Sequence, residues 1–191
     1  MGSLALVLVF ATSHGAVGLV PIAVYAVCLV AMLGCSAAYH LAAPSPRRAV
    51  LRRIDQAMIF LMIAGTYTPF TADRLAGSWS TSLTAGIWIL ALAGAAAQLA
   101  MPQRIEGVSI ALYLALGWVW LIAAGPIFAA LDMQTLVLLG AGGSLYAIGI
   151  IFHLWHRLPF QNAVWHGFVV WAACCHYAAV FYGVVLTGTA S

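Results

Sequence analysis

Long apolar runs separated by short polar stretches make up almost the whole chain. The runs cover residues 4–11, 20–41, 56–70, 80–101, 110–131, 135–154 and 163–186. Most are too long for strands, and a helix bonds all its backbone polar groups within its own segment, as lipid requires. The pattern therefore predicts seven membrane helices, of which the first is short or truncated at its N-terminus.

The composition supports a membrane protein and excludes a soluble one. Hydrophobic residues make up 65% of the chain and charged residues only 6%, which cannot cover a water-soluble surface. Because each span needs about 20 residues, a chain of 191 residues has no room for a separate soluble domain. We expect one all-α, polytopic membrane domain over residues 1–191, with membrane lipids and no nucleic acid as partners. The four cysteines lie inside apolar runs, which favours packing over a disulfide or thiolate zinc motif.

The arginines predict the orientation of the helices. Six of them fall in alternate connections: Arg47, Arg48, Arg52, Arg53, Arg104 and Arg157. Arginine is in excess in short cytoplasmic loops, so these connections should share the cytoplasmic side. We therefore expect the N-terminus in the cytoplasm and the C-terminus outside. The cluster after the second run is foremost a topology determinant, and the alternative is that it also grips anionic lipid headgroups.

Polar residues from three predicted helices should meet at one depth, near the cytoplasmic side. Ser36 and His40 end the second run, Asp55 opens the third, and Asn162 and His166 open the seventh. A step of four residues keeps both members of each pair on one helix face. Imidazoles from different helices, with a carboxylate and a hydroxyl nearby, suit a zinc ion.

Each of these residues also has a simpler interpretation. A single histidine at a helix end is most often an interfacial or hydrogen-bonded residue. Asp55 stands directly before the third run, where it could serve as the N-terminal cap of that helix. His176 lies about 15 Å deeper than His166 and on another face, so we expect it to hydrogen-bond inside the bundle.

Three segments of the chain carry a family resemblance. They are Ser36-Ala-Ala-Tyr39-His40, LRRIDQAMIFLMIAGTYTPF and RLPFQNAVWHGFVVWAACCHYAAV. In this order they resemble the bacterial hemolysin III-like members of the progestin and adipoQ receptor superfamily, relatives of adiponectin receptors and alkaline ceramidases. The resemblance spans about residue 20 to the C-terminus. It implies a seven-helix bundle in the bacterial inner membrane with a cytoplasmic N-terminus.

The resemblance also implies roles for the site residues. In that family one histidine of the second helix and a His-x-x-x-His pair of the seventh hold the metal. Carried over, His40 and His166 are two ligands, and Asp55 and Ser36 are the auxiliary residues around the water on the metal. Asn162 stands where the family has the first histidine of the pair, and an amide oxygen is a poor zinc ligand. We expect zinc binding to be weakened or absent, with Asp55 or water filling the third place, or with no metal at all.

Three functions remain open at this point. The first is membrane homeostasis or a receptor-like role, in which any metal couples the helices structurally. The alternative is a zinc-dependent hydrolase of lipid amides or esters, in which Asp55 accepts a proton and Ser36 orients the reacting group or stabilises the oxyanion. The second alternative is a pore-forming hemolysin, although no helix carries a polar stripe that would line a channel.

Overall fold

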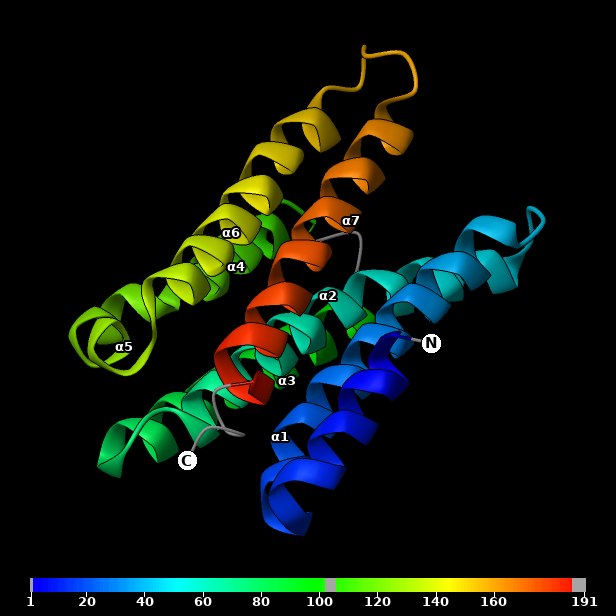
Figure 1. Cartoon of the computed structure of the whole chain (residues 1–191). Helices are drawn as coiled ribbons and strands as arrows, with labels where there is room; N and C mark the ends of the chain where they lie inside the picture. Colours follow the sequence, from blue (N-terminus) through cyan, green and yellow to red (C-terminus); the bar gives the residue numbers. More distant parts are fainter. Residues whose placement is uncertain (1, 102–105, 187–191) are drawn as a thin grey trace. The chain divides into compact units, whose positions relative to one another are not determined.

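The computed structural model is helical almost throughout, as the apolar runs predict. It describes the backbone of residues 2–101 and 106–186 and the side chains of residues 19–101 and 107–186. This part of the chain contains no β-strand (Figure 1). The chain divides into two compact units, Met1–Val119 and Trp120–Ser191. Arg104, which the predicted orientation uses, lies outside the described residues.

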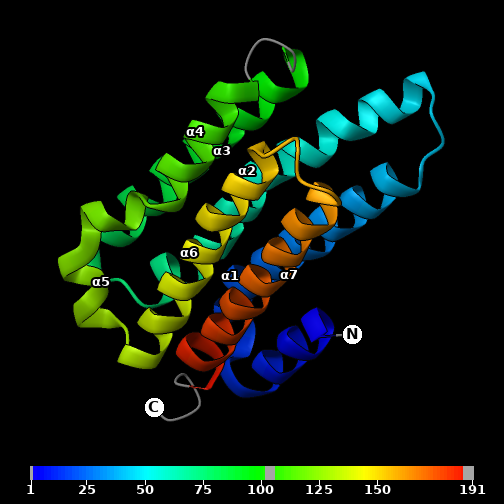
Figure 2. The same ribbon diagram turned by 90° about the horizontal axis from the view of Figure 1, so that it is seen from above.

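The first unit is built around α2. The helix α1 (Gly2–Leu41) packs on α2 (Pro46–Asp73), and α2 packs on α3 (Gly77–Ala100). The shorter α4 (Glu106–Gly117) contacts α2 and α3. Figure 2 shows α1 and α2 running side by side as a hairpin. A small residue allows α3 to pack closely on α2, since a Cβ on Gly94 of α3 would lie 2.5 Å from the ring of Phe60 in α2.

The helix α1 contains both of the first two predicted helices. The ribbon bends sharply in the N-terminal half of α1 (Figure 2), and Pro21 lies inside the helix. Proline lacks the N–H that would bond to the preceding turn, and its ring displaces that turn. The weakly polar Ser13-His14-Gly15 therefore lies within continuous helical structure rather than at a break.

The helix α2 begins about three turns earlier than its apolar run. Its N-cap is Ser45, whose hydroxyl accepts a hydrogen bond from the backbone N–H of Arg48 at 3.3 Å. Pro46 follows at the first helical position, where proline is favoured. The prediction that Asp55 caps this helix is wrong, because Asp55 lies well inside α2. The hydrophobic pattern missed the true start because the first turns are rich in arginine, a good helix former.

The second unit contains a tight helical hairpin. The helices α6 (Met133–Leu154) and α7 (Gln161–Val180) run side by side and antiparallel (Figure 1). Glycines of α6 face large side chains of α7: a Cβ on Gly149 would lie 2.9 Å from the Cβ of Phe168. The seventh run continues past α7 as a π-helical segment, Phe181–Leu186.

The fifth apolar run, residues 110–131, is not one regular helix. α4 ends at Gly117, a 3-10 helix covers Val119–Ala123, and α5 covers Ala124–Ala130. Glycine is a weak helix former, and Pro126 cannot donate the hydrogen bond that would continue a helix through this point. Local sequence thus divides a segment whose hydrophobicity alone predicts a continuous span.

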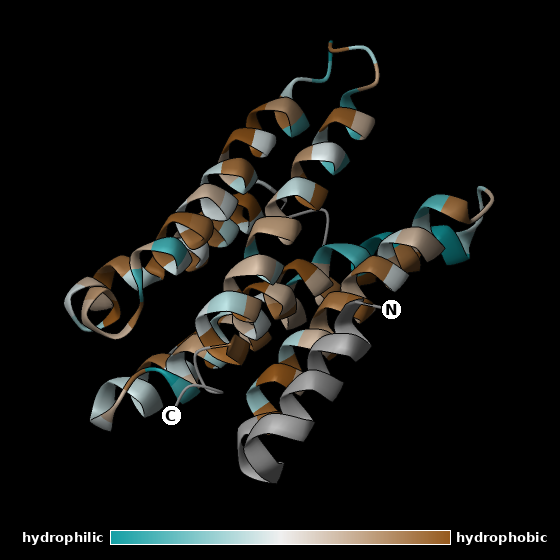
Figure 3. Cartoon of the chain, viewed as in Figure 1, coloured by the Kyte–Doolittle hydropathy of each residue, from teal (hydrophilic) through white to brown (hydrophobic). Residues whose placement is uncertain are grey.

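Five described segments are long and apolar enough to cross a membrane: Leu19–Leu41, Gly77–Ala100, Gly107–Ala130, Met133–Leu154 and Gln161–Leu186. Figure 3 shows that hydrophobic residues dominate these helices. The helix α2 is not among the five, because its arginines, aspartates and threonines make its sequence more polar. The five segments indicate a multi-pass membrane protein.

Candidate functional site

Ser36 and His40 lie on the last turns of α1. Their four-residue spacing places them near one another on the helix surface. Ser36 is half-buried and His40 is exposed. The ring of His40 lies beside that of Tyr39, with 4.6 Å between the ring centroids. The imidazole is therefore accessible at the end of the apolar segment Leu19–Leu41.

Asp55 lies level with these two residues, because of the register of the α1–α2 hairpin. A Cβ on Gly65 of α2 would lie 2.7 Å from the Cβ of Cys28 of α1, so these two positions are opposite each other. Ten residues along each helix, or about 15 Å, lead to residue 55 on α2 and residue 38 on α1. Asp55, which is half-buried, thus lies at the level between Ser36 and His40.

A chain of polar side chains holds the backbone next to Asp55. The amide of Gln98 in α3 donates to Oε1 of Gln56 at 2.7 Å, and the hydroxyl of Ser109 in α4 donates to Oε1 of Gln98 at 2.7 Å. The hydroxyl of Tyr113 donates to the backbone oxygen of Gln56 at 2.9 Å. Gln98 is only 1% exposed. This chain fixes α2 against α3 and α4 at the candidate site.

One residue could have pointed to this polar chain from the sequence alone. Gln98 interrupts the apolar run 80–101, and a polar side chain inside a spanning helix needs a partner. The partners of Gln98, which are Gln56 and Ser109, could not be chosen from the sequence because several other polar residues lie in or beside apolar runs. Gln56 serves as an acceptor through both its side chain and its backbone oxygen.

Asn162 and His166 lie on the first turns of α7, in the second unit. Asn162 is exposed and His166 is half-buried. The start of α7 is held by the side chain of Gln161, which donates to the backbone oxygen of His153. Trp165 packs on the ring of His153, with 5.1 Å between centroids. The first turns of α7 are thereby fixed against the end of α6.

His176 forms contacts inside the α6–α7 hairpin, as predicted. Its Nε2 lies 3.4 Å from the backbone oxygen of Leu139, within hydrogen-bonding distance. Its ring lies against Tyr146, with 5.6 Å between centroids, and fills the space next to Gly142. These contacts give His176 a packing role.

The five predicted site residues are divided between the two units. Ser36, His40 and Asp55 belong to the first unit, and Asn162 and His166 to the second. Within either unit, the described residues contain no group of three or more histidines, cysteines, aspartates or glutamates that could hold a metal ion. Zinc binding by these five residues stays a prediction.

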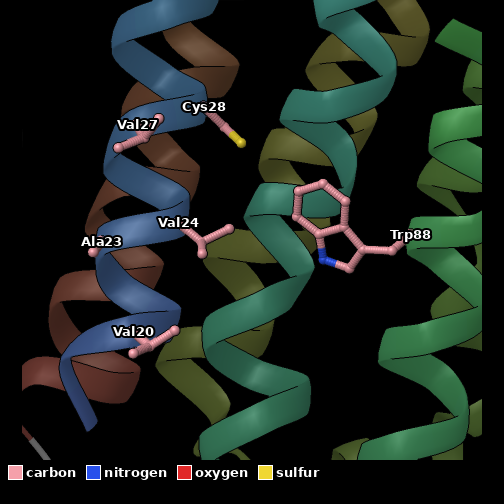
Figure 4. A pocket seen from close by; sticks show the side chains of 6 residues that line it. All are labelled: Val20, Ala23, Val24, Val27, Cys28 and Trp88. Atoms are coloured by element: carbon pink, nitrogen blue, oxygen red, sulfur yellow. The ribbon is translucent and has the colours of Figure 1, made fainter. Parts of the chain in front are cut away.

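An apolar pocket of about 390 Å³ lies between α1 and α3 in the first unit. Figure 4 shows five side chains of α1 on one side and an indole of α3 on the other: Val20, Ala23, Val24, Val27, Cys28 and Trp88. The indole N–H of Trp88 is already bonded to the hydroxyl of Thr68 at 3.0 Å. Cys28 is a buried packing residue, as predicted. The pocket thus presents an apolar surface and supplies no set of polar groups for catalysis.

The helical architecture and the apolar segments define a multi-pass membrane protein, and sequence comparison identifies its family. The model of the Haemolysin-III related family matches residues 1–177, so the chain belongs to this family. The resemblance seen in the three segments is thereby confirmed.

Similar proteins come from bacteria and from animals. The chain is 33% identical to the hemolysin-3 homolog of Bacillus subtilis (strain 168) over 184 residues, which cover 95% of this chain and 86% of that protein. It is 33% identical to hemolysin-3 of Bacillus cereus over 188 residues, or 98% and 86% of the two chains. It is 28% identical to the human monocyte to macrophage differentiation factor over 131 residues, or 66% and 52%. No solved structure matches the chain.

Proposed function

We propose that this haemolysin III-related protein acts in membrane homeostasis or as a receptor-like protein, with a weak zinc site. In this proposal seven helices span the bacterial inner membrane, the N-terminus is cytoplasmic and the C-terminus lies outside. The alternation of arginine-containing connections supports this orientation. The observation that carries the proposed site is the register of the α1–α2 hairpin, which brings Ser36, His40 and Asp55 to one level.

The chemistry of the donors fits a weak zinc site. His40 and His166 supply imidazoles and Asp55 supplies a carboxylate, which are ordinary zinc donors. Asn162 supplies a neutral amide oxygen, a poorer donor than the imidazole found in the family. Zinc held by these residues would supply Lewis acidity toward a carbonyl group. We place the homeostasis role first because hydrolysis depends on the metal shell that Asn162 weakens.

One observation keeps a lipid amide or ester hydrolase as the second candidate. Asp55 is not the cap of its helix, and its half-buried carboxylate lies level with the hydroxyl of Ser36. In the hydrolase, Asp55 would accept a proton from water and Ser36 would donate a hydrogen bond to the developing oxyanion. The polar chain through Gln56 and Gln98 would keep the backbone at Asp55 in place.

Metal analysis of the purified full-length chain tests the site. We expect substoichiometric zinc that chelators remove easily, and we expect His40→Ala to lose it. The exposed His156, which the proposal does not use, provides the control His156→Ala, and this variant should bind zinc as the natural chain does. Zinc binding that is equal in both variants, or no binding even with zinc in excess, would contradict the site.

Lipid turnover by the same preparation distinguishes the two functions. The purified chain is incubated with ceramide-like amides and simple lipid esters in nanodiscs. If hydrolysis occurs, Asp55→Asn should reduce it by about 10²-fold while zinc content stays unchanged. The absence of turnover in zinc-loaded protein would exclude these substrates and favour the homeostasis role.

A further inference from the structure

The end of the α1–α2 hairpin carries a dense positive charge next to an apolar segment. The segment Leu19–Leu41 ends four residues before the N-cap Ser45. Four of the seven arginines then fall within the first two turns of α2: Arg47, Arg48, Arg52 and Arg53. Figure 3 shows hydrophilic residues at this end of the hairpin. Because the apolar segment ends here, we expect these arginines at the level of the lipid headgroups.

One of these arginines has a defined position. The guanidinium carbon of Arg48 lies 5.0 Å from the centroid of the Tyr39 ring, within the range of a cation–π contact. The Nε of Arg48 is buried, and the described residues supply no hydrogen-bond acceptor for it. The contact positions a guanidinium group whose planar fork carries several N–H donors.

A second arginine extends this surface. Arg52 follows Arg48 by four residues, so both project from the same face of α2, and Arg52 is exposed. Paired guanidinium groups match the oxygens of a phosphate, which accepts two parallel N–H bonds from each fork.

A topology determinant alone does not need this arrangement. Orientation depends on the number of positive charges in a loop, and a charge held against an aromatic ring serves no purpose in that count. We propose that the surface formed by Tyr39, Arg48 and Arg52 binds the phosphate of an anionic phospholipid. The occupant is a lipid rather than a soluble anion because the surface adjoins the end of an apolar membrane segment.

This inference goes beyond the proposed function and does not depend on zinc. All three residues belong to the first unit, and none is a proposed metal ligand. The binding measurements can therefore be made with a chelator present. Failure of the zinc site would leave lipid binding intact, and failure of lipid binding would leave the metal analysis unaffected.

Native mass spectrometry of the purified full-length chain tests the proposal. The protein is titrated with phosphatidylglycerol and, separately, with phosphatidylcholine of the same acyl chains. We expect at least about tenfold tighter binding of phosphatidylglycerol. Arg48→Gln should weaken it by about fivefold or more, because the phosphate loses the charge-assisted hydrogen bonds of one guanidinium fork. Arg48→Lys should also weaken it, because lysine keeps the charge but loses the planar fork.

Arg157→Gln is the matched control, because it removes one exposed arginine from the connection between α6 and α7. It should change binding by less than about twofold, because Arg157 is not part of the proposed surface and an exposed charge that does not contact the phosphate contributes little in water. Equal losses in Arg48→Gln and Arg157→Gln, or full binding by Arg48→Lys, would reduce the effect to net charge and overturn the proposal.

Inorganic phosphate, added to the protein in phosphatidylcholine nanodiscs, tests whether the ligand is a lipid or a free anion. If phosphate alone stabilises the protein as much as phosphatidylglycerol does, the lipid is not the ligand. Tyr39→Phe keeps the aromatic ring under Arg48, so this variant should bind phosphatidylglycerol as the natural chain does.

Discussion

The imidazole of His176 occupies the space directly next to Gly142. A methyl group on Gly142 would lie 2.4 Å from Cδ2 and 2.5 Å from Nε2 of this ring. Gly142→Ala should therefore destabilise the α6–α7 hairpin by about 1–3 kcal/mol, because the ring must move in a packed interior. Unfolding of the purified protein in mixed detergent micelles measures this change.

The neighbouring glycine provides the control. A Cβ on Gly143 would meet nothing within 4 Å, so Gly143→Ala should be neutral or stabilise the helix by up to about 1 kcal/mol. Equal destabilisation by both substitutions would show that helix flexibility, rather than the His176 ring, determines the outcome.

Gln98 of α3 bonds to side chains of α2 and α4, so its replacement should lower the free energy of unfolding of the purified protein. Gln98→Met leaves Oε1 of Gln56 and the hydroxyl of Ser109 without this partner, at an expected cost of about 1–2 kcal/mol. Gln134→Met, at an exposed position, is the control and should cost little. A double-mutant cycle with Ser109→Ala should give a coupling energy of about 0.6 kcal/mol. Strict additivity would mean that the Gln98–Ser109 bond contributes nothing to stability.

Asp132 should make the stability of the protein depend on pH. The hydroxyl of Thr135 donates to Oδ2 at 2.7 Å and its backbone N–H donates to Oδ1 at 2.9 Å, and these bonds hold the pKa of Asp132 below its ordinary value. Since the folded pKa is lower than the unfolded one, the stabilisation is complete above about pH 4 and is lost as the pH falls through the folded pKa.

Two substitutions distinguish the N-cap hydrogen bonds of Asp132 from its negative charge. Asp132→Ala should cost about 1 kcal/mol at neutral pH because α6 loses its N-cap. Asp132→Asn should keep most of the stability at neutral pH and remove this part of the acid dependence. Unfolding measured between about pH 7 and pH 3 checks both, and an unchanged acid slope in Asp132→Asn would disprove the assignment.

Asn162→His should strengthen zinc binding by about tenfold or more, because an imidazole replaces a weak oxygen donor. Ala163→His adds an imidazole at the next exposed position, which faces another side of α7. It serves as the control and should leave affinity unchanged. Competition with a chromophoric chelator measures both. Equal effects at positions 162 and 163 would mean that the added histidine does not complete the proposed shell.

The orientation can be tested by labelling single cysteines in a background without the four native ones. A cysteine within residues 44–53 should resist an impermeant thiol reagent in intact cells, because this connection is predicted to be cytoplasmic. A cysteine at Ser191, which lies outside the described residues, should react. Labelling with the opposite pattern would reverse the proposed topology.

Hydrophobicity predicted helices well where the local sequence agreed with it. The runs 80–101 and 135–154 correspond to Gly77–Ala100 and Met133–Leu154 within a few residues. It failed at the start of α2 because charged residues also form helices, and Ser45 rather than Asp55 provides the cap. The single domain over residues 1–191 and the count of seven spans stay predictions.

Only part of the candidate site could be predicted from the sequence. The spacing of Ser36 and His40 predicted a shared face of α1, since helical periodicity is a local property. The level of Asp55 relative to them depends on where α1 meets α2, which the contact of Cys28 with Gly65 sets. No local pattern identifies which small residue allows two helices to approach.

The sequence by itself determined the helical class and the membrane environment, because an apolar segment in lipid must bond its backbone polar groups internally. It also determined which residues could serve as zinc donors, since that follows from their side-chain chemistry. Only the tertiary structure decided that Gln98 bonds to Gln56 and Ser109, that His176 lies against Gly142, and that Arg48 lies over the ring of Tyr39. These pairs depend on how neighbouring helices are placed against each other, and that placement results from packing over whole helix faces rather than from any short stretch of sequence.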